Sequence, residues 1–267
     1  MPELPEVETI RLQLRRSVLN KKIKDVIVKD ARVIKGISGS AFKTKVKNKT
    51  IKDVIRRGKV LILELGSSLY LVIHLRISGW LRLNKGIEKF CRVGFVLNNG
   101  RILNFCDSRV LGEIKLIGDY EKLPIIKSMG PEPLGLGKAK FIKLFEKKTT
   151  KIKPLLMDQN FLAGVGNIYA QEALFCAGVK PERKSNEIDK KELEKIYTCL
   201  ISILRKAISK KGASVDTYRQ IDGDEGEYIP LLKVYQRQAK PCFKCKSPIR
   251  RKSIGGRGTY FCPRCQK

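Results

Sequence analysis

The chain has 267 residues, enough for one large domain or two ordinary ones. Hydrophobic residues make up 42% of it, which is typical of a globular protein, and no apolar run approaches the roughly 18 residues that a membrane span needs. Its 56 Lys and Arg against 26 Asp and Glu give a formal net charge of +30. A lysine-rich surface without a partner would carry the same charge, but the absence of an amphipathic anchor favours nucleic acid over an anionic membrane.

The N-terminal segment begins with acidic residues rather than with the basic region of a secretory signal, so we expect a cytoplasmic protein. Residues 4–18 then place apolar side chains near one helical face, at Val7, Ile10, Leu14 and Val18. This spacing predicts a short amphipathic helix. Proline and acidic residues at its start suit a helix N-terminus.

Between Lys22 and Leu116 the pattern changes to short apolar runs with the alternation of β-strands. The sequence Asn98-Asn99-Gly100 favours a tight hairpin turn. We therefore expect a β-sandwich or barrel-like domain with the first helix packed on it.

A proline- and glycine-rich break at residues 127–137 predicts a linker. Beyond it the apolar residues recur with a helical period, at 138–148, 151–158, 167–177 and 189–211. A polar stretch follows at 212–228. The second half is therefore expected to be helical, which gives an α+β protein of two domains.

Four cysteines near the C-terminus form two Cys-x-x-Cys pairs, made by Cys242, Cys245, Cys262 and Cys265. This spacing is typical of a zinc ribbon with four thiolate ligands, and a redox dithiol is the alternative. Because four sulfurs complete the tetrahedral shell of Zn²⁺, the ion would be structural. The loop at 255–259 between the pairs carries three glycines and Arg257, which suits close approach to a phosphate.

The other four cysteines are scattered along the chain, at Cys91, Cys106, Cys176 and Cys199. Their neighbours are apolar, as in the stretches that end at Cys106 and Cys176. We expect all four to be buried free thiols in a reducing compartment rather than disulfides.

Residues 158–181 predict two helices joined by a turn that contains Gly164 and Gly166, with Asn167 opening the second helix. Free backbone N–H groups at a helix start, together with an Asn amide, can hold a phosphate. The alternative is an ordinary Asn cap on a helical hairpin.

The extreme N-terminus, Met1-Pro2-Glu3, offers a reactive group. Removal of Met1 would leave a secondary amine on Pro2, with a pKa of about 8 against about 10.4 for Lys. Such an amine can attack a sugar C1′ and form an imine. Glu3 could protonate the sugar ring oxygen, and Glu6 lies one helical turn further on. The alternative is a simple helix start of proline and acidic residues.

Taken together, these motifs resemble the bacterial formamidopyrimidine-DNA glycosylases along essentially the whole chain. The matching segments follow the family's order: PELPEVE at the N-terminus, RRGKVL around Lys59, HLRISG at 74–79, DSRVLG at 107–112, GVGNIY at 164–169 and GGRGTYFCPRCQ near the C-terminus. The PELPEV opening also separates the chain from the related endonuclease VIII branch.

The resemblance implies a catalytic β-sandwich domain over residues 1–130, a helix–two-turn–helix DNA-binding domain over 131–231 and a zinc finger over 232–267. Double-stranded DNA with oxidised purines or abasic sites would lie in the cleft between the two lobes. The protein would be a bacterial, nucleoid-associated monomer with one structural Zn²⁺. An enzyme that excises a base must first take it out of the stack, and this costs least at a damaged pair.

The resemblance also implies the chemistry. Pro2 would displace the damaged base (8-oxoguanine or a formamidopyrimidine) from C1′, with Glu3 as proton donor and Glu6 supporting the site. β- and δ-Elimination would then break the strand on both sides of the lesion. Lys59 and Arg257 match residues that hold phosphates and donate protons in these eliminations.

The DNA-contacting positions include departures from the family. Lys153 and Asn167 match residues that contact the DNA backbone. The wedge that fills the vacated stack is usually Met, Arg and Phe, and the matching residues here are Ile77, Arg109 and Leu111. Arg109 would face the orphaned cytosine, and Ile and Leu can still separate bases, with less contact area than Phe.

The polar segment 214–226 matches the loop that closes over the damaged base, and its glycines suit a mobile lid. We assign no chemistry to His74 and no DNA contact to Phe90 or Arg92. Two alternatives stay open: an oxidised-pyrimidine glycosylase of the same superfamily, and a non-catalytic protein that binds damaged DNA. The second would not need the reactive groups at the N-terminus and at Lys59.

Overall fold

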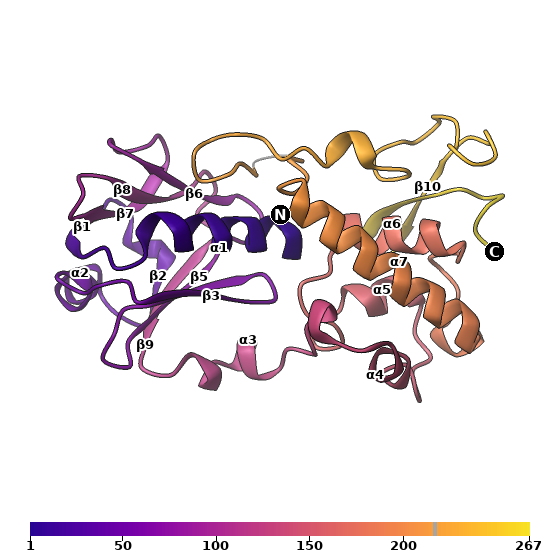
Figure 1. The fold of residues 1–267 in the computed structure, drawn as a ribbon, viewed down its shortest axis with the longest axis horizontal. Coiled ribbons are helices and arrows are strands. Elements are labelled where there is room, and N and C mark those ends of the chain that lie inside the picture. Colours follow the sequence, from indigo (N-terminus) through magenta and orange to yellow (C-terminus); the bar gives the residue numbers. More distant parts are fainter. Residues whose placement is uncertain (216–217) are drawn as a thin grey trace. The chain divides into compact units, whose positions relative to one another are not determined.

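The protein is described by a computed structural model, which covers residues 1–215 and 218–267. Its chain forms two compact units, each described here by itself. Unit 1 comprises Met1–Lys127 and Lys210–Ile229, and unit 2 comprises Ser128–Ser209 and Pro230–Lys267. Figure 1 shows mainly strands in the first unit and mainly helices in the second. No helix among the described residues is long and apolar enough to cross a membrane.

Helix α1, Leu4–Val18, has the bounds that the apolar spacing predicts. The side chains expected on its inner face, including Val7 and Leu14, are buried and belong to the main core of unit 1. The helix begins at Glu3, which forms a reciprocal capping box with Glu6. This pairing satisfies N–H groups that the first turn of a helix leaves without partners.

Two sheets form a β-sandwich in unit 1, as expected. One has the strand order β1-β7-β8-β6 and the other β2-β9-β5-β4-β3. The strands are β1 Ile23–Val28, β2 Ile34–Lys35, β3 Asp53–Arg57, β4 Val60–Glu64, β5 Tyr70–His74, β6 Gly79–Asn84, β7 Cys91–Leu97, β8 Ile102–Asp107 and β9 Glu113–Ile117. Helix α2, Gly39–Val46, packs on β1, and the short α3, Pro124–Lys127, ends the first segment of the unit.

The turn between β7 and β8 has the predicted hairpin form. Leu97 and Arg101 flank it and are hydrogen-bonded, and Gly100 takes a left-handed φ of 79°. Asn98 and Asn99 each accept a backbone N–H through their side chains. The turn thus uses both the conformational freedom of glycine and the hydrogen-bonding capacity of asparagine.

Residues 210–229 belong by their contacts to unit 1, although they follow the helices of unit 2 in sequence. Tyr218 and Ile221 are part of the core of the sandwich. The backbone N–H of Leu83 in β6 donates to the Ile221 carbonyl at 2.8 Å. The helical domain expected over residues 131–231 stays a prediction. Its helices lie in unit 2, which does not include residues 210–229.

Unit 2 combines α-helices with one hairpin. The helices are α4 Lys138–Lys143, α5 Ile152–Met157, α6 Asn167–Ala177 and α7 Lys190–Ser209, and the hairpin is formed by β10 Arg250–Ile254 and β11 Arg257–Phe261. Helix α4 ends five residues before the expected boundary at 148. The chain tightens there into i to i+3 hydrogen bonds, and Lys147 adopts a left-handed φ of 61°.

The expectation of four free scattered thiols is wrong for one pair. Cys176 and Cys199 form a disulfide, because the packing of α6 on α7 brings their Cα atoms to 5.9 Å. Apolar neighbours in the sequence suggested burial, but Cys176 lies on the exposed face at the end of α6. Cys91 and Cys106 are buried free thiols, as predicted, and face each other across β7 and β8.

Gly130, at the start of unit 2, packs against the backbone near Phe161. A Cβ at position 130 would lie 2.4 Å from the Phe161 carbonyl oxygen, whereas one at Gly135 would meet nothing within 4 Å. We expect Gly130→Ala to lower the free energy of unfolding by about 1–3 kcal/mol, the usual cost of overpacking. Gly135→Ala should change it by less than about 0.5 kcal/mol. Chemical denaturation of both variants measures this difference in the free energy of unfolding. Equal denaturation midpoints would contradict the close approach of Gly130 to the Phe161 backbone.

Candidate functional site

The N-terminus of α1 is organised around the carboxylate of Glu6, which is 1% exposed. One oxygen accepts the backbone N–H of Glu3 at 2.9 Å, and the other accepts that of Ala213 at 2.8 Å. A side chain at Gly212 would come within 2.8 Å of the same carboxylate. Glu6 therefore joins the residue that follows Pro2 to the returning segment of unit 1.

Pro2 and Glu3 are both buried, and Met1 in front of them is 38% exposed. With Met1 in place, the Pro2 nitrogen is part of a peptide bond and has no basic lone pair. Removal of Met1 stays a prediction. The structure thus brings together Pro2, Glu3 and Glu6 as the sequence suggested.

Lys59 lies in the two-residue turn between β3 and β4 and is 6% exposed. The turn is fixed by Arg56, whose guanidinium donates to the Gly58 carbonyl at 2.8 Å and to the Glu8 carboxylate of α1 at 2.9 Å. Burial raises the pKa of Glu8, but the hydrogen bonds from Arg11 and Arg56 outweigh it and hold the pKa below its usual range. This ionic bridge connects the hairpin of Lys59 to the helix that follows Pro2.

His74, at the end of β5, is a neutral residue in this environment. Burial, with smaller contributions from Arg76 and Lys59, lowers the pKa of His74 to about 4. Its Nδ1 accepts the backbone N–H of Arg76 at 3.0 Å. His74 is thus a satisfied polar residue next to the Lys59 hairpin, with the proton off the ring at neutral pH.

Asp107, at the end of β8, holds the two loops that carry the expected wedge. Its buried carboxylate accepts from the Ser78 hydroxyl at 2.6 Å, from the Arg109 N–H at 3.0 Å and from the Gly112 N–H at 2.6 Å. Burial raises the pKa of Asp107, and these hydrogen bonds lower it below its usual value. One ionised carboxylate therefore fixes the backbone on both sides of the wedge.

The side chains expected to form the wedge point outward from this support. Ile77 is 42% exposed and Leu111 is 45% exposed, and Arg109 is also exposed. Arg92 differs, because its guanidinium is engaged with the Asp107 carbonyl at 2.7 Å and with Asp30.

The expected lid, residues 214–226, includes two positions (216 and 217) outside the described residues. The part that follows is tied to unit 1. The Gln13 side chain donates to that of Gln220 at 2.6 Å, and a side chain at Gly223 would collide with the Arg82 guanidinium. The Tyr218 hydroxyl donates to the Lys211 carbonyl, and burial, with the neighbouring Glu6 carboxylate, raises the pKa of Tyr218. Mobility of this segment as a lid stays a prediction.

In unit 2, the turn between α5 and α6 contains Gly164 and Gly166 as expected, and its role as an anion cradle stays a prediction. Gln159 fixes the turn, since its side chain accepts the Gly164 N–H and donates to the Val165 carbonyl, both at 2.8 Å. Gly166 precedes α6, and Asn167 is the first residue of the helix. The Asn167 amide also donates to the Gly258 carbonyl at 3.3 Å, next to Arg257.

A buried lysine supports the hairpin that carries Arg257. Lys153 of α5 is fully buried, and its Nζ donates to the Thr259 hydroxyl at 2.7 Å. That hydroxyl in turn donates to the Arg257 carbonyl at 3.0 Å. Gly255 and Gly256 form the turn, both with positive φ, which leaves Arg257 exposed beside it. In this structure Lys153 supports the hairpin, and its direct contact with DNA stays a prediction.

Two polar residues of α6 were missed by the sequence analysis. Gln171 accepts the Tyr260 N–H at 2.6 Å and donates to the carbonyls of Asn167 and Gly258. Glu172 accepts three consecutive backbone N–H groups, from Lys233, Val234 and Tyr235, at 2.8–2.9 Å. Burial raises the pKa of Glu172, and this effect outweighs the lowering by the three N–H groups. Adjacent polar residues inside an apolar helical run were the available sign.

The four C-terminal cysteines converge as their spacing predicts. The sulfurs of Cys242, Cys245, Cys262 and Cys265 lie within 4.8 Å of one another. The Cys245–Cys262 and Cys242–Cys265 sulfurs are 3.4 and 3.9 Å apart. Tetrahedral Zn²⁺ with Zn–S bonds of about 2.3 Å requires sulfurs about 3.8 Å apart. The group fits one zinc ion and leaves no ligand position for a substrate.

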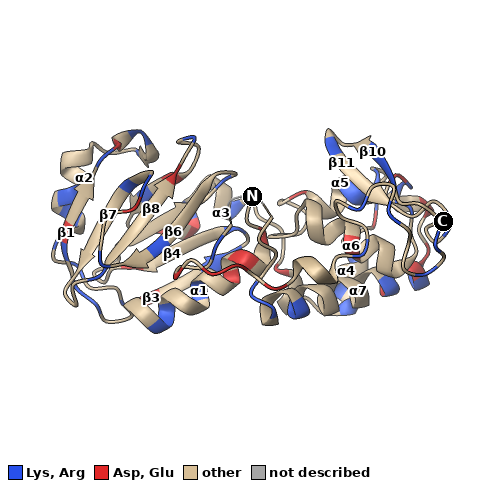
Figure 2. Cartoon of the chain, turned by 90° about the horizontal axis from the view of Figure 1, so that it is seen from above, with Lys and Arg blue, Asp and Glu red and all other residues tan. Residues whose placement is uncertain are grey.

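Basic side chains are prominent on both units. Figure 2 shows Lys and Arg along α1 and α2 of unit 1, and along α7 and β10 of unit 2. On β10 they are consecutive, at Arg250, Arg251 and Lys252, and all three are exposed. Such a stripe beside Arg257 suits a polyanion.

Three family models match consecutive parts of the chain. The model of the formamidopyrimidine-DNA glycosylase N-terminal domain matches residues 1–114, that of the H2TH domain of the same glycosylase matches 129–219, and that of a zinc finger found in FPG and IleRS matches 239–267. The formamidopyrimidine-DNA glycosylase of Pelotomaculum thermopropionicum is 40% identical over 100% of this chain and 99% of its own length. That of Listeria innocua is 38% identical over the whole of both chains.

Solved structures agree with these matches. The MutM (Fpg) protein of Thermus thermophilus has a TM-score of 0.90 at 36% identity, covering 99% of this chain and 98% of its own. A mutant Lactococcus lactis Fpg, crystallised with DNA that contains Fapy-dG, has a TM-score of 0.92 at 34% identity over the whole of both chains. Fold, site and matches define a DNA-repair glycosylase with a zinc finger.

The chain belongs to the formamidopyrimidine-DNA glycosylase family. The resemblance inferred from the sequence is thereby confirmed, as is the expected fold of a β-sandwich followed by a helix–two-turn–helix domain with a four-cysteine zinc finger. The expectation of an enzyme, a DNA glycosylase with AP-lyase activity, is confirmed with it. The roles of the individual residues are taken up below.

The low pKa of His74 predicts how stability depends on pH. The folded state resists protonation down to about pH 4, whereas the unfolded chain binds a proton near the usual pKa of 6.5. The contribution of His74 is therefore complete above pH 6.5 and is lost as the pH falls from 6.5 to 4, by at most about 1.4 kcal/mol per pH unit. Urea unfolding of the wild type and of His74→Asn should show curves that diverge in this window. If the stability of both proteins depended on pH in the same way, the lowered pKa of His74 would be contradicted.

Proposed function

We propose that the protein excises oxidised purines from double-stranded DNA, with Pro2 as the nucleophile once Met1 is removed. The observation that carries this proposal is the placement of the N-terminus by Glu6. Its carboxylate fixes the Glu3 N–H and, through Ala213, the returning segment of unit 1. A helix start without chemistry would need the capping box alone, but not a buried carboxylate shared with a residue 207 positions away.

In the proposed reaction the Pro2 nitrogen attacks C1′ of the lesion nucleotide, and the bond from C1′ to the base breaks. Glu3 supplies a proton at the sugar or the departing base. Loss of the amine proton and opening of the sugar ring then leave a cationic imine between Pro2 and the sugar. Glu6 does not touch the sugar in this scheme and acts as a positioning residue, because both of its oxygens are occupied by backbone N–H groups.

The imine acidifies the neighbouring sugar hydrogens, so the two phosphates can leave by successive β- and δ-elimination. We propose that Lys59 and Arg257 hold these phosphates and donate protons to the leaving oxygens. Lys59 lies on the hairpin of β3 and β4. Arg56 connects this hairpin to α1 through its hydrogen bond to Glu8. Arg257 stands on a hairpin supported by Lys153 and Asn167. Because hydrogen bonds fix both hairpins, the side chains of Lys59 and Arg257 can be held in the geometry that elimination requires.

Ile77, Arg109 and Leu111 are proposed to enter the DNA stack in place of the extruded nucleotide. They are exposed side chains on loops whose backbones are fixed by Asp107. Apolar wedges can hold a base step open, and Arg109 supplies donors for the orphaned cytosine. The Lactococcus lactis protein was crystallised with DNA containing Fapy-dG, and also with DNA containing an abasic site. By that relationship we propose the same substrate classes here, met on the DNA of the bacterial nucleoid.

The direct test is reduction of the imine with borohydride on a duplex that contains 8-oxoguanine opposite cytosine. Processed protein should become covalently attached to the DNA, and peptide mass spectrometry should place the adduct on Pro2. Pro2→Gly should trap at least about 100-fold less, the scale on which loss of an activated nucleophile acts. Protein whose intact mass retains Met1 serves as the matched control and should not trap at all. Equal trapping by the retained-Met1 form would refute the assignment.

Asp107→Asn tests the wedge separately from the chemistry. The amide cannot reproduce three accepted hydrogen bonds, so the loops should loosen, and excision of 8-oxoguanine should fall on the order of ten-fold. Borohydride trapping on a preformed abasic site, where no base needs to be extruded, should fall much less. Asp119→Asn is the control, since that carboxylate is half-exposed and its partners, Glu121 and Lys122, lie within one turn of it. An equal loss on both substrates would argue against a role in base extrusion.

A further inference from the structure

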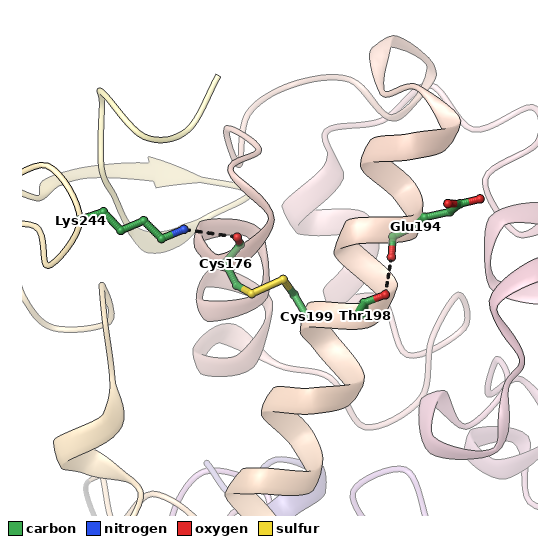
Figure 3. Close-up of a disulfide and its surroundings, with 5 residues drawn as sticks. All are labelled: Cys176, Glu194, Thr198, Cys199 and Lys244. Atoms are coloured by element: carbon green, nitrogen blue, oxygen red, sulfur yellow. Dashed lines mark hydrogen bonds between the residues drawn. A yellow bond between two sulfur atoms is a disulfide. The ribbon is translucent and has the colours of Figure 1, made fainter.

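The disulfide of unit 2 lies outside the chemistry described above. It joins Cys176, the penultimate residue of α6, to Cys199 in the middle of α7 (Figure 3). Cys176 is exposed and Cys199 is half-buried. A disulfide with an exposed half is open to attack by a thiolate from solution, because exchange requires access along the bond to one sulfur.

The surroundings of this disulfide are cationic. It lines a groove of about 430 Å³ together with Lys138, Lys191 and Lys195, all exposed. Glu194 is the one carboxylate that lines the groove among the described residues. Lys138 comes from the start of α4 and the other two lysines from α7, so the charges stand on separate elements around the sulfur pair. A groove lined by three lysines and one glutamate concentrates anions.

We propose that Cys176–Cys199 is a site of thiol–disulfide exchange for small anionic thiols, meaning thiols that carry carboxylates. The external thiolate attacks the exposed Cys176 sulfur, the bond between the two protein sulfurs breaks, and Cys199 leaves as a thiolate. A second external thiolate then attacks the mixed disulfide, which releases Cys176 and forms the external disulfide. Two electrons pass to the protein, two external thiols are oxidised, and the reverse sequence restores the bond.

The position of the bond gives the exchange a structural consequence. Helix α6 begins at Asn167 and carries Gln171 one turn later, and its C-terminal end meets the zinc finger. Lys244, which lies between two zinc-ligand cysteines in sequence, donates to the Cys176 carbonyl at 3.5 Å and lies 4.9 Å from the Phe175 ring centre. Figure 3 shows Lys244 reaching this carbonyl, with the disulfide leading from the same residue to α7. The bond therefore fixes α7 to the helix end on which the finger rests.

Exchange rates measured on the zinc-loaded full chain test the proposal. Glutathione, a thiol with net negative charge, is compared with the cationic thiol cysteamine at equal concentrations of thiolate. Alkylation followed by peptide mass spectrometry reports the release of Cys176 and Cys199. Glutathione should react several-fold faster than cysteamine. The double variant Lys191→Glu/Lys195→Glu should reverse this preference, and Lys148→Glu, on an exposed lysine outside the groove, should leave it unchanged.

Two results would overturn the proposal. The first is that both cysteines react with the alkylating agent before any reductant is added, and that a separate sample incubated with oxidised glutathione before alkylation reacts to the same extent, because no exchangeable bond would then exist. The second is that the preference for glutathione is absent, or survives the double charge reversal, because the lysines would then not select the thiol.

The Cys176→Ser/Cys199→Ser variant separates the disulfide from the zinc site and from the repair chemistry. The thermal midpoint of the wild type should fall by several degrees on reduction by glutathione, as expected for loss of a cross-link, and that of the variant should not respond. The variant should retain zinc and trap on 8-oxoguanine DNA like the wild type. A thermal midpoint of the variant that responds equally would place the effect at the zinc cysteines and refute the assignment.

Discussion

A single buried carboxylate, that of Glu6, underlies the arrangement of unit 1. A carboxylate taken out of water is costly unless its oxygens are hydrogen-bonded, and here each oxygen receives a backbone N–H. One N–H belongs to the residue after Pro2 and the other to Ala213, so the same group sets the start of the first helix and the return of the chain from unit 2. Gly212 is required beside it, since a side chain there would displace the carboxylate. The N-terminal segment is therefore placed by these hydrogen bonds together with the apolar packing of α1.

Unit 2 applies the same principle to a buried ammonium group as well as to a buried carboxyl group. The ammonium group of Lys153 is buried with the Thr259 hydroxyl as acceptor, and Gln171 and Glu172 bind backbone groups of the finger and of the segment before it. Because unsatisfied polar groups would be expensive at these positions, these contacts fix how α5 and α6 pack against the hairpin and the segment 233–235. The position of Arg257 is thus set through its backbone carbonyl, which accepts from the Thr259 hydroxyl.

Features with a local cause were predictable from the sequence. The helix at 4–18 follows from apolar periodicity, the turn at Gly100 from its asparagines and glycine, and the zinc group from cysteine spacing. Features that depend on distant residues were not. Residues 210–229 contain few apolar side chains, and nothing in their pattern shows that Tyr218 and Ile221 complete the core of a domain that begins at residue 1. The pairing of Cys176 with Cys199 likewise depends on how two helices pack, which the apolar context of each cysteine does not reveal. The family resemblance supplied the assignment of Lys153 to DNA contact, and only the structure shows its side chain supporting Thr259.

The return of residues 210–229 to unit 1 has a consequence for how the protein can be divided. The chain passes between the units three times, near residues 127, 209 and 229. The three family matches suggest consecutive modules, yet a fragment that ended at residue 127 would lack Ala213, the partner of Glu6, and two members of its own core. A single break in any one connection leaves the two units joined by the remaining ones. Unit 1 is thus discontinuous in sequence, and an exchange of residues 131–231 as one block would also replace Ala213 and two members of the core of unit 1.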